Sequence, residues 1–545
     1  MSRIKHIYGV IIFSVLSSIF IVNIISILFP VTGKIGTYLW FFSYIFFVIL
    51  ALTGLYHFIK EALTEKLFIT LLLVIIWLFI IGSNINRVKN VSSEATQQIG
   101  HVVSLLHFSK TMGFNDQCFI GYPARQFFLP SLPTLIMGRR VLSLNLGGSL
   151  YVITGLLIFS RAIVINFEDR RCGDLAGGII LSLIFHIYYV NYQIFWFEQS
   201  IYPFGFTLII CGLYLYYIKD KSLANLSLTG LTVMYLIYSY TPSLSMACLS
   251  ITVLIYYYIK NFKYRDKKRN LIIAMIIIFC IVSFCLSLHF RSDVKLIGNN
   301  NNSNEIRSKI NEFFLIETKL IVSPVSTFIF CFILLFSIFI MMRWTMFFLA
   351  MWAIVTFFVS AVSTGFAVPP PCFAIHRAII IYPVMFIMFI NIIKSTHIDF
   401  KEKYYVEIMI FLFLLITGII YQQSYINTKN EPTGRIYQYV LIKWLQKEIP
   451  EKEITQNTTL YFDEALKGEP YISTYDMMLY FTPKYHTNFP DKKTDLSKCI
   501  IPSESNFLLV PPDKIKNQCY KNIKNRLKYI NTFCGQQTMC LYKIE

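Results

Sequence analysis

Long apolar runs alternate with short polar connections along most of this sequence. Over the first 420 residues, runs of about 18 residues or more recur, which is the pattern of a helical membrane protein with many spans. The first run is too long for a signal-peptide core and is followed at once by a second, so we interpret it as a retained helix. About thirteen transmembrane helices are predicted, at 8–29, 37–58, 67–82, 147–165, 175–191, 200–218, 223–240, 243–259, 271–290, 322–342, 345–363, 374–393 and 405–421.

Charged residues lie mostly between the spans, and they favour one side. With the N-terminus inside, the cytoplasmic ends and connections carry nineteen Lys and Arg residues, whereas the short outer connections carry only Lys34 and Arg377. This is the positive-inside pattern, which predicts a cytoplasmic N-terminus. Three longer pieces then face outwards, at 83–147, 291–321 and 422–545.

The chain is therefore expected to have two domains. Residues 1–421 form an all-α polytopic membrane domain, and residues 422–545 form a small extracytoplasmic α/β domain of ordinary composition. In the second domain an amphipathic helix is predicted at 431–449, and strands are predicted at 458–463, 506–512 and 538–544.

Four cysteines of the C-terminal domain lie in a compartment where disulfides persist. They are Cys499, Cys519, Cys534 and Cys540. Pairing Cys534 with Cys540 and Cys499 with Cys519 is one of three possible connectivities.

Composition excludes some classes of function. With 55% apolar, 17% aromatic and 14% charged residues, the chain is too apolar for a string of soluble domains. The net charge of +19 suggests nucleic acid at first, but outside the tail most of that charge lies in the orienting connections, so no nucleic-acid partner is expected. No Cys or His spacing indicates a zinc site.

The first outer piece, 83–147, is too long to be a simple turn and is the predicted working part. A helix from Glu94 to about residue 109 has an apolar stripe and would lie along the outer interface, and 122–139 reads as a second interfacial or re-entrant element. Glu94 and Asp116 are the acids of this piece and are the catalytic candidates, since a carboxylate at the membrane edge can act as general base. The alternative interpretation is a first-turn acid for Glu94 and a turn former for Asp116.

Basic and aromatic residues at the outer side are the candidates for binding the donor phosphate and the substrate. A guanidinium suits bidentate binding of phosphate, and the alternative for each arginine is an interfacial anchor. Glu198 and Tyr202 are candidates to line the same cavity; the alternative is a satisfied interfacial acid for Glu198 and an aromatic-belt residue for Tyr202. The set comprises Tyr122, Arg125, Glu198, Tyr202, His376 and Arg377.

The order of these features resembles the GT-C superfamily of membrane glycosyltransferases, which includes protein O-mannosyltransferases and aminoarabinose transferases of lipid A. The resemblance is carried by SSEATQQIGHVVSLL (92–106), GFNDQCFIGYPARQFFLPSLPTLIMGR (113–139), LNLGGSLYVITGLLIFSRAI (144–163) and HRAIIIYP (376–383). In layout it covers residues 67–420. The chain departs from the family in having Ser93-Glu94 where members often have Asp-Glu, which leaves one carboxylate there, and in having two extra spans before the loop.

This resemblance implies a sugar donor carried on a polyprenyl phosphate, with Glu94 deprotonating the acceptor and the basic residues stabilising the departing phosphate. The acceptor would be lipid A, a polysaccharide or a protein, and membrane lipid is a further partner. No cofactor is certain, and a divalent metal is possible because family members with and without a metal exist. The resemblance also implies the outer face of a bacterial inner membrane and a role in the cell envelope.

Three other functions stay open from the sequence. A transporter or flippase of lipid-linked sugars would place ionisable groups near the bilayer midplane and show repeated halves. An O-antigen polymerase or ligase would carry its large outer loop late in the chain. A non-catalytic GT-C relative is compatible with the single acid at Ser93-Glu94.

Overall fold

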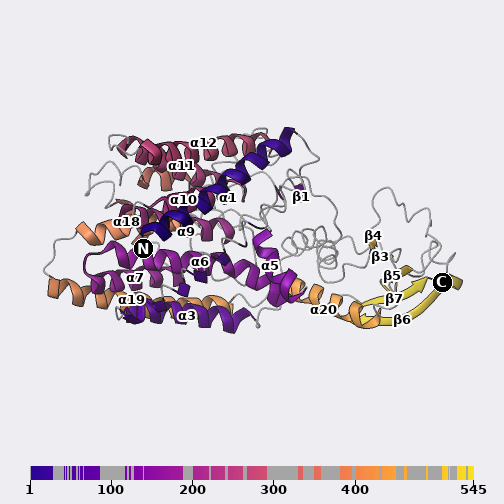
Figure 1. Cartoon of the computed structure of the whole chain (residues 1–545). Coiled ribbons are helices and arrows are strands. Elements are labelled where there is room, and N and C mark those ends of the chain that lie inside the picture. Colours follow the sequence, from indigo (N-terminus) through magenta and orange to yellow (C-terminus); the bar gives the residue numbers. More distant parts are fainter. Residues whose placement is uncertain are drawn as a thin grey trace, which may run out of the picture. The chain divides into compact units, whose positions relative to one another are not determined.

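The structure is a computed structural model. The residues that it describes are 2–28, scattered positions of 42–64, 67–85, 117–119, 122–123, 128–187 except 139, 201–219, 222–239, 243–261, 267–290, 329–335, 349–356, 381–395, 400–428, 433–449, 459–462, 486–488, 506–515 except 514, 524–534 and 538–544. The described part is mostly helical, with a small sheet near the C-terminus, as predicted (Figure 1). Two compact units are present: one contains nearly all of the long helices up to Thr428, and the other contains residues 130–144, α20 and the C-terminal strands.

Long apolar helices form the first unit. They are α1 (Ser2–Leu28), α3 (Phe68–Ile85), α6 (Val141–Asn166), α7 (Arg170–Phe185), α9 (Ile201–Lys219), α10 (Leu223–Ile237), α11 (Ser243–Asn261), α12 (Lys267–Phe290), α18 (Tyr382–Ser395) and α19 (Phe400–Thr428). Each overlaps a predicted span, which confirms the helical character of these segments. The total of about thirteen spans stays a prediction.

Several helix ends differ from the predicted ones because polar side chains fix them. Helix α7 begins at Arg170, five residues before the predicted span, because Asp169 caps it and accepts a hydrogen bond from the Arg171 backbone N–H at 2.9 Å. It ends at Phe185 rather than at residue 191. Helix α10, by contrast, begins at Leu223 as predicted, and Ser222 caps it in the same way.

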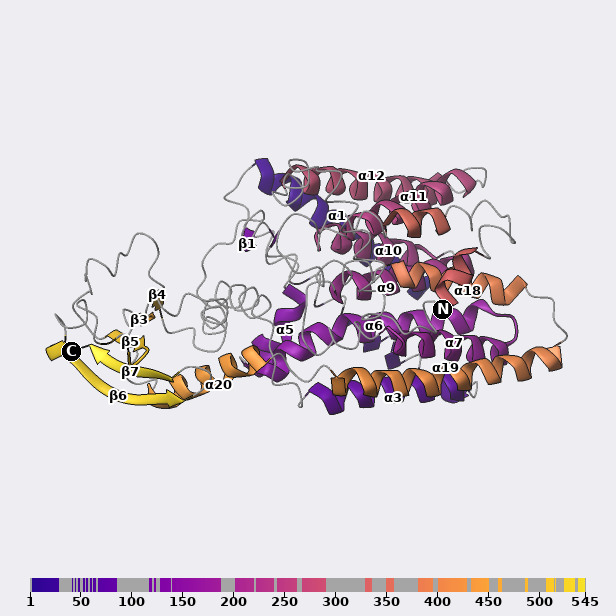
Figure 2. The same ribbon diagram turned by 180° about the vertical axis from the view of Figure 1, so that it is seen from behind.

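Helix α7 is buried on every side. Every residue from Gly173 to Phe185 is buried. Helices α3 and α19 pack against it in both views of the bundle (Figures 1 and 2). The Trp77 ring of α3 stacks on Phe185 with 4.5 Å between centroids, and the His186 Nε2 atom lies 2.9 Å from the Leu414 carbonyl oxygen of α19. A helix that is apolar all round belongs in the centre of a bundle.

The outward faces of the flanking helices are also apolar. On α3, Phe68, Leu72, Ile75 and Phe79 are each more than half exposed and recur at helical spacing. On α19 the exposed set includes Tyr405, Val406, Met409, Phe413, Ile416 and Ile420. A soluble monomer rarely exposes such continuous apolar faces, whereas hydrocarbon solvates them. The chain is therefore a membrane protein, and two of its described segments, Ser149–Asn166 and Asn270–Ser287, are long and apolar enough to cross a bilayer.

Hydrogen bonds join helix ends that were predicted to lie on the same side. At the predicted cytoplasmic end, the Lys394 ammonium of α18 donates to the backbone and side-chain oxygens of Asn166, the last residue of α6. At the predicted outer end, the Ser287 hydroxyl of α12 donates to the Ile237 carbonyl of α10 at 3.2 Å. In both cases the two bonded helix ends were predicted to lie on the same side of the membrane. The compartment that each side faces remains a prediction.

Asp174 of α7 caps a helix that lies more than 100 residues away in sequence. Its carboxylate accepts hydrogen bonds from the backbone N–H groups of Ile69 at 3.0 Å and Thr70 at 2.8 Å, in the first turn of α3. The side chain is only 6% exposed. Buried N–H groups that lose their acceptor cost free energy, so this carboxylate fixes the start of α3 against α7.

We expect Asp174→Ala to lower stability by about 1–2 kcal/mol, because both N–H groups lose their acceptor. Thermal unfolding of the purified protein in detergent measures this loss. Glu168→Ala, at an exposed position beside the start of α7, is the control and should leave the midpoint unchanged. Equal midpoints for the two variants would show that the Asp174 cap contributes nothing.

The second unit contains a mixed sheet in the order β4-β3-β5-β7-β6. Its strands are β3 (Thr459–Phe462), β4 (His486–Asn488), β5 (Asn506–Val510), β6 (Leu527–Cys534) and β7 (Thr538–Ile544). Strands β4, β3 and β5 are parallel, and β7 runs antiparallel to both β5 and β6. Helix α20 (Thr433–Glu448) packs Trp444 against Phe533 with 5.2 Å between ring centroids. The predicted helix and three strands match described elements, whereas β4 and β6 were not predicted.

The predicted pairing of Cys534 with Cys540 is wrong in this structure, where both are free cysteines. The strand register gives the reason: Cys540 lies opposite Thr532, and Cys534 lies opposite Thr538. Cys534 is exposed and Cys540 is buried, so the two thiols have different surroundings. Cys499 and Cys519 lie outside the described residues.

Candidate functional site

Most of the residues predicted to form the site lie outside the described part of the chain. Tyr122 is in the short strand β2 (Tyr122–Pro123), and Tyr202 is in the first turn of α9, so the structure gives the backbone of these two. The structure describes neither the predicted helix from Glu94 to residue 109 nor six of the candidates, which are Glu94, Asp116, Arg125, Glu198, His376 and Arg377. Their roles therefore remain predictions.

The described part of the first outer loop contains a hairpin and a short helix. Strand β1 (Gln117–Phe119) pairs with β2, and α5 (Phe128–Met137) follows. Helix α5 buries Ser131 and Thr134 but leaves Ile136 82% exposed. It ends at Gly138, whose φ of +82° is a conformation that glycine adopts without strain. An exposed isoleucine beside buried hydroxyls is compatible with an apolar environment around the end of this helix.

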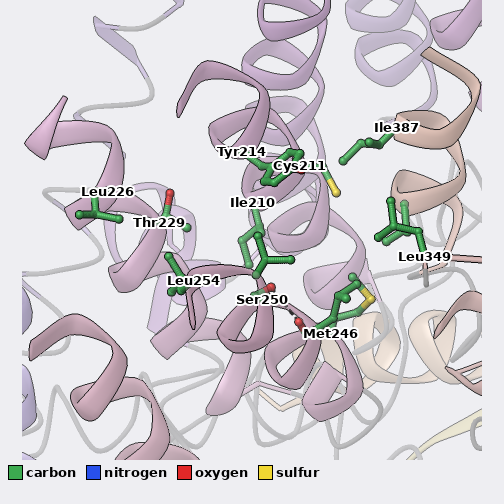
Figure 3. A pocket seen from close by; sticks show the side chains of 13 residues that line it. Ile210, Cys211, Tyr214, Leu226, Thr229, Met246, Ser250, Leu254, Leu349 and Ile387 are labelled. Carbon is green, nitrogen blue, oxygen red and sulfur yellow. Dashed lines mark hydrogen bonds between the residues drawn. The ribbon is translucent and has the colours of Figure 1, made fainter. Parts of the chain in front are cut away.

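An apolar pocket lies within the helical bundle. The space between its walls is about 690 Å³, a figure that includes the part open to the surroundings. The pocket lies between α9, α10, α11 and α18, with Leu349 at its margin (Figure 3). Its lining comprises Ile210, Cys211, Tyr214, Leu226, Thr229, Met246, Leu249, Ser250, Val253, Leu254, Leu349, Val384 and Ile387.

Two of the three hydroxyls of this lining, those of Thr229 and Ser250, are already satisfied by their own helices. Thr229 Oγ1 donates to the Asn225 carbonyl at 2.7 Å, and Ser250 Oγ donates to the Met246 carbonyl at 2.7 Å. No charged side chain lines the pocket among the described residues. A ligand of this pocket therefore gains from apolar contact and finds little to hydrogen-bond, as expected for a flexible hydrocarbon chain.

Close backbone packing holds α9, one wall of the pocket, against α6. A side chain at Gly205 would begin 2.7–2.8 Å from the Cβ, carbonyl carbon and carbonyl oxygen of Tyr151. At the same contact, a Cβ on Gly155 would lie 2.7 Å from the Gly205 carbonyl oxygen. Small residues allow membrane helices to approach this closely, and the approach fixes the side of α9 that faces the pocket.

Aromatic contacts position α18, the opposite wall of the pocket. Phe386 of α18 lies 6.2 Å from Phe159 of α6 and 6.2 Å from Phe330, measured between ring centroids. Tyr382, the first residue of α18, lies 4.7 Å from Phe330. Together with the Lys394–Asn166 contact at the other end, these contacts hold α18 along its whole length.

Sequence reasoning did not find the pocket. Its lining residues are the ordinary apolar and small residues of membrane spans. A helix face that lines a pocket has the same sequence pattern as a helix face that packs against another helix. The structure also shows no group of three or more His, Cys, Asp and Glu that would suit a metal ion within the residues that it describes.

The solved structures that are similar to this chain include two of ArnT. The crystal structure of ArnT from Cupriavidus metallidurans in the apo state matches with a TM-score of 0.45 and 9% sequence identity, over 87% of this chain and 97% of ArnT. The crystal structure of ArnT bound to undecaprenyl phosphate matches with a TM-score of 0.47 and 10% identity over the same shares. No protein-family model and no curated protein matches the sequence. The chain is thus similar to ArnT over most of the length of both chains.

Proposed function

We propose that this protein is an integral membrane glycosyltransferase. It transfers a sugar from a polyprenyl-phosphate donor to an acceptor at the outer face of the membrane, in the cell envelope. The observation that carries the proposal is the apolar pocket between α9, α10, α11 and α18, which suits the lipid chain of such a donor. The sequence resemblance to GT-C enzymes supports the reaction class, and the exposed apolar helices support the membrane setting.

The predicted phosphate-binding residues adjoin the pocket helices in sequence. Arg377 precedes Tyr382, the first residue of α18, by five positions, and His376 precedes it by six. Tyr202 belongs to the first turn of α9, and Glu198 precedes that helix. Both helices begin at the predicted outer side. A lipid chain that extends from the pocket along α9 and α18 to the predicted outer side would have its phosphate near these residues, where guanidinium groups bind it.

The reaction then needs a base and a stabiliser of the leaving group. Glu94 takes the proton of the acceptor hydroxyl, and the acceptor oxygen attacks the anomeric carbon of the sugar. The bond from that carbon to the phosphate oxygen breaks, its electron pair leaves with the phosphate, and the configuration inverts. Arg377, Arg125 and His376 stabilise the negative charge of the departing phosphate.

Filling the pocket should weaken donor binding. We expect Val253→Trp to raise the dissociation constant for polyprenyl phosphate about tenfold, because the indole displaces part of the lipid chain and removes about 1.4 kcal/mol of apolar contact. Ile278→Trp is the matched control, since Ile278 is 54% exposed on α12 and does not line the pocket. Affinity is measured with the purified protein in detergent.

Two results would contradict the proposal. If Val253→Trp and Ile278→Trp bind the lipid equally well, the pocket is not the site of the lipid chain. If reconstituted wild-type protein moves an intact labelled lipid-linked sugar across the bilayer and releases no sugar to any acceptor, the protein is a flippase rather than a transferase.

A further inference from the structure

The apolar pocket has a definite position along the length of the bundle, because contacts fix the direction of each helix around it. Gly205 of α9 packs against Tyr151 of α6. About two turns further along both helices, Gly212 packs against Phe159. Helices α6 and α9 therefore run parallel and end on the same side of the bundle.

The other helices around the pocket fit the same frame. Lys394, next to the end of α18, donates to the carbonyl of Asn166, the last residue of α6, so α18 ends on that side too. Helix α10 begins there, because only residues 220–222 separate it from α9. The Ser243 hydroxyl, at the start of α11, donates to the Leu236 carbonyl near the end of α10, so α11 begins on the opposite side. We call the side where α6, α9 and α18 end the lower end of the bundle, and the opposite side the upper end.

The deepest lining residues lie near the lower end. Tyr214 lies thirteen residues after Ile201, the first residue of α9, which is about 20 Å from the upper end at a rise of 1.5 Å per residue. Leu226 belongs to the first turn of α10, and Leu254 lies seven residues before the end of α11. On α11 the lining continues up to Met246, in the first turn of that helix. The pocket therefore extends along α11 from the upper end to a floor formed by Tyr214, Leu226 and Leu254.

This floor is deeper than one leaflet of a bilayer. The hydrocarbon core is about 30 Å thick, so the chains of each leaflet cover about 15 Å. Helices α9 and α11 have 19 residues each, which corresponds to about 28 Å, and so they cross nearly the whole core. Seen from the upper end, the floor then lies past the midplane. A lipid chain that is confined to the upper leaflet stops before it.

The chemistry of the lining indicates a hydrocarbon chain, and not a headgroup, at this depth. Within the described part of the chain the lining has no charged side chain, and the hydroxyls of Thr229 and Ser250 are bonded to carbonyl groups of their own helices. Apolar contact then supplies the binding free energy, and it grows with the length of chain that reaches the floor.

We propose that the floor selects donors by the length of their lipid chain. This inference rests on the proposed function, which puts the donor phosphate at the upper end, where α9 and α18 begin. A chain longer than one leaflet reaches Tyr214, Leu226 and Leu254 and gains apolar contact there. A shorter chain lacks that contact. The donor class is therefore a polyprenyl phosphate whose chain is longer than one leaflet.

Binding of two polyprenyl phosphates tests the inference on the full-length protein in phosphatidylcholine nanodiscs. The probes are farnesyl phosphate, whose chain spans roughly one leaflet, and decaprenyl phosphate, whose chain is several times longer. They are compared at equal mole fractions in the bilayer. Wild type should bind decaprenyl phosphate at least about tenfold more tightly, a difference that burial of about two further methylene groups already supplies.

Two replacements on α10 narrow the pocket at or next to its floor. Leu226→Trp and, separately, Thr229→Trp should lower the affinity for decaprenyl phosphate about tenfold, while farnesyl phosphate still binds as it does to wild type. Thr229 is half-buried, so its replacement disturbs less packing than that of Leu226, which is 2% exposed. Leu271→Trp is the matched control, because Leu271 is 62% exposed near the start of α12 and does not line the pocket. Both affinities of this control should equal those of wild type.

Three results would overturn the inference. They are equal binding of both probes by wild type, loss of farnesyl phosphate binding together with decaprenyl phosphate binding in the two α10 variants, and equally strong displacement of decaprenyl phosphate by phosphatidylglycerol. The last result would make the pocket a general site for acyl chains. The comparison on wild type needs no variant, so it decides even where Leu226→Trp does not fold.

The same samples separate this inference from the proposed function. Equal binding of both probes alongside normal sugar transfer refutes only the selection by chain length. The expected preference alongside a complete absence of transfer to any acceptor refutes the proposed transferase, and the selection then belongs to a protein that binds or moves long lipids.

Discussion

Replacing Glu94 with glutamine is expected to lower the rate of sugar transfer about 10²–10⁴-fold, while the donor lipid still binds. Glutamine keeps the size and much of the hydrogen bonding of glutamate, but it cannot accept a proton from the acceptor hydroxyl. The family resemblance places a carboxylate at this position, and Ser93 occupies the neighbouring position where relatives often have another acid. In the proposed mechanism, Glu94 acts as base alone or with Asp116. The measurement is single-turnover release of a radiolabelled sugar from polyprenyl phosphate, with lipid binding measured on the same samples.

Three companion measurements sharpen this prediction. Asp116→Asn should lower the rate of sugar transfer much less than Glu94→Gln does if Glu94 is the base. A larger loss of rate in Asp116→Asn would assign that role to Asp116. Arg377→Ala should weaken binding of the donor phosphate as well as transfer. Transfer measured with EDTA and then with added Mg²⁺ or Mn²⁺ decides whether a divalent metal takes part. Normal transfer by Glu94→Gln would remove the proposed base.

Gly205→Val is expected to destabilise the membrane domain by about 3 kcal/mol. The first carbon of any side chain at this position would lie 2.7–2.8 Å from the Tyr151 Cβ and from two Tyr151 backbone atoms. Real carbon atoms do not approach this closely, and backbone atoms cannot rotate away as the end of a side chain can. Helices α6 and α9 would have to separate, and the pocket wall that α9 forms would move with them.

Thermal unfolding in detergent checks the Gly205 prediction, with an expected fall in the midpoint of about 5 °C or more. Gly205→Ala should also lower the unfolding midpoint, by a smaller amount than Gly205→Val. Ser18→Val adds apolar volume at an exposed position of α1 and is the control, so its midpoint should stay near that of wild type. If Gly205→Val and Ser18→Val have the same midpoint, α6 and α9 are not held by this contact.

The sequence by itself determined which long apolar segments are helices and where α20 and three strands of the C-terminal sheet lie. Apolar runs of sufficient length and turn-bounded short strands are local patterns, so α6, α9, α12, β5 and β7 were predicted in roughly the right places. It did not identify Asp169 as the cap of α7, so the predicted span begins five residues too late. Charge asymmetry indicated the sides because it depends on counts in the connections and not on packing.

Only the tertiary structure decided the features that join distant parts of the chain. Asp174 caps α3 from another helix, the β6–β7 register separates Cys534 from Cys540, and residues of α9, α11 and α18 enclose the apolar pocket. The spacing of apolar residues along the chain cannot predict these features. That spacing is the same whether the residues face a pocket, a neighbouring helix or lipid. Which of these surroundings they meet depends on how closely the backbones approach, and at Gly205 and Gly155 that distance is set by the two helices together.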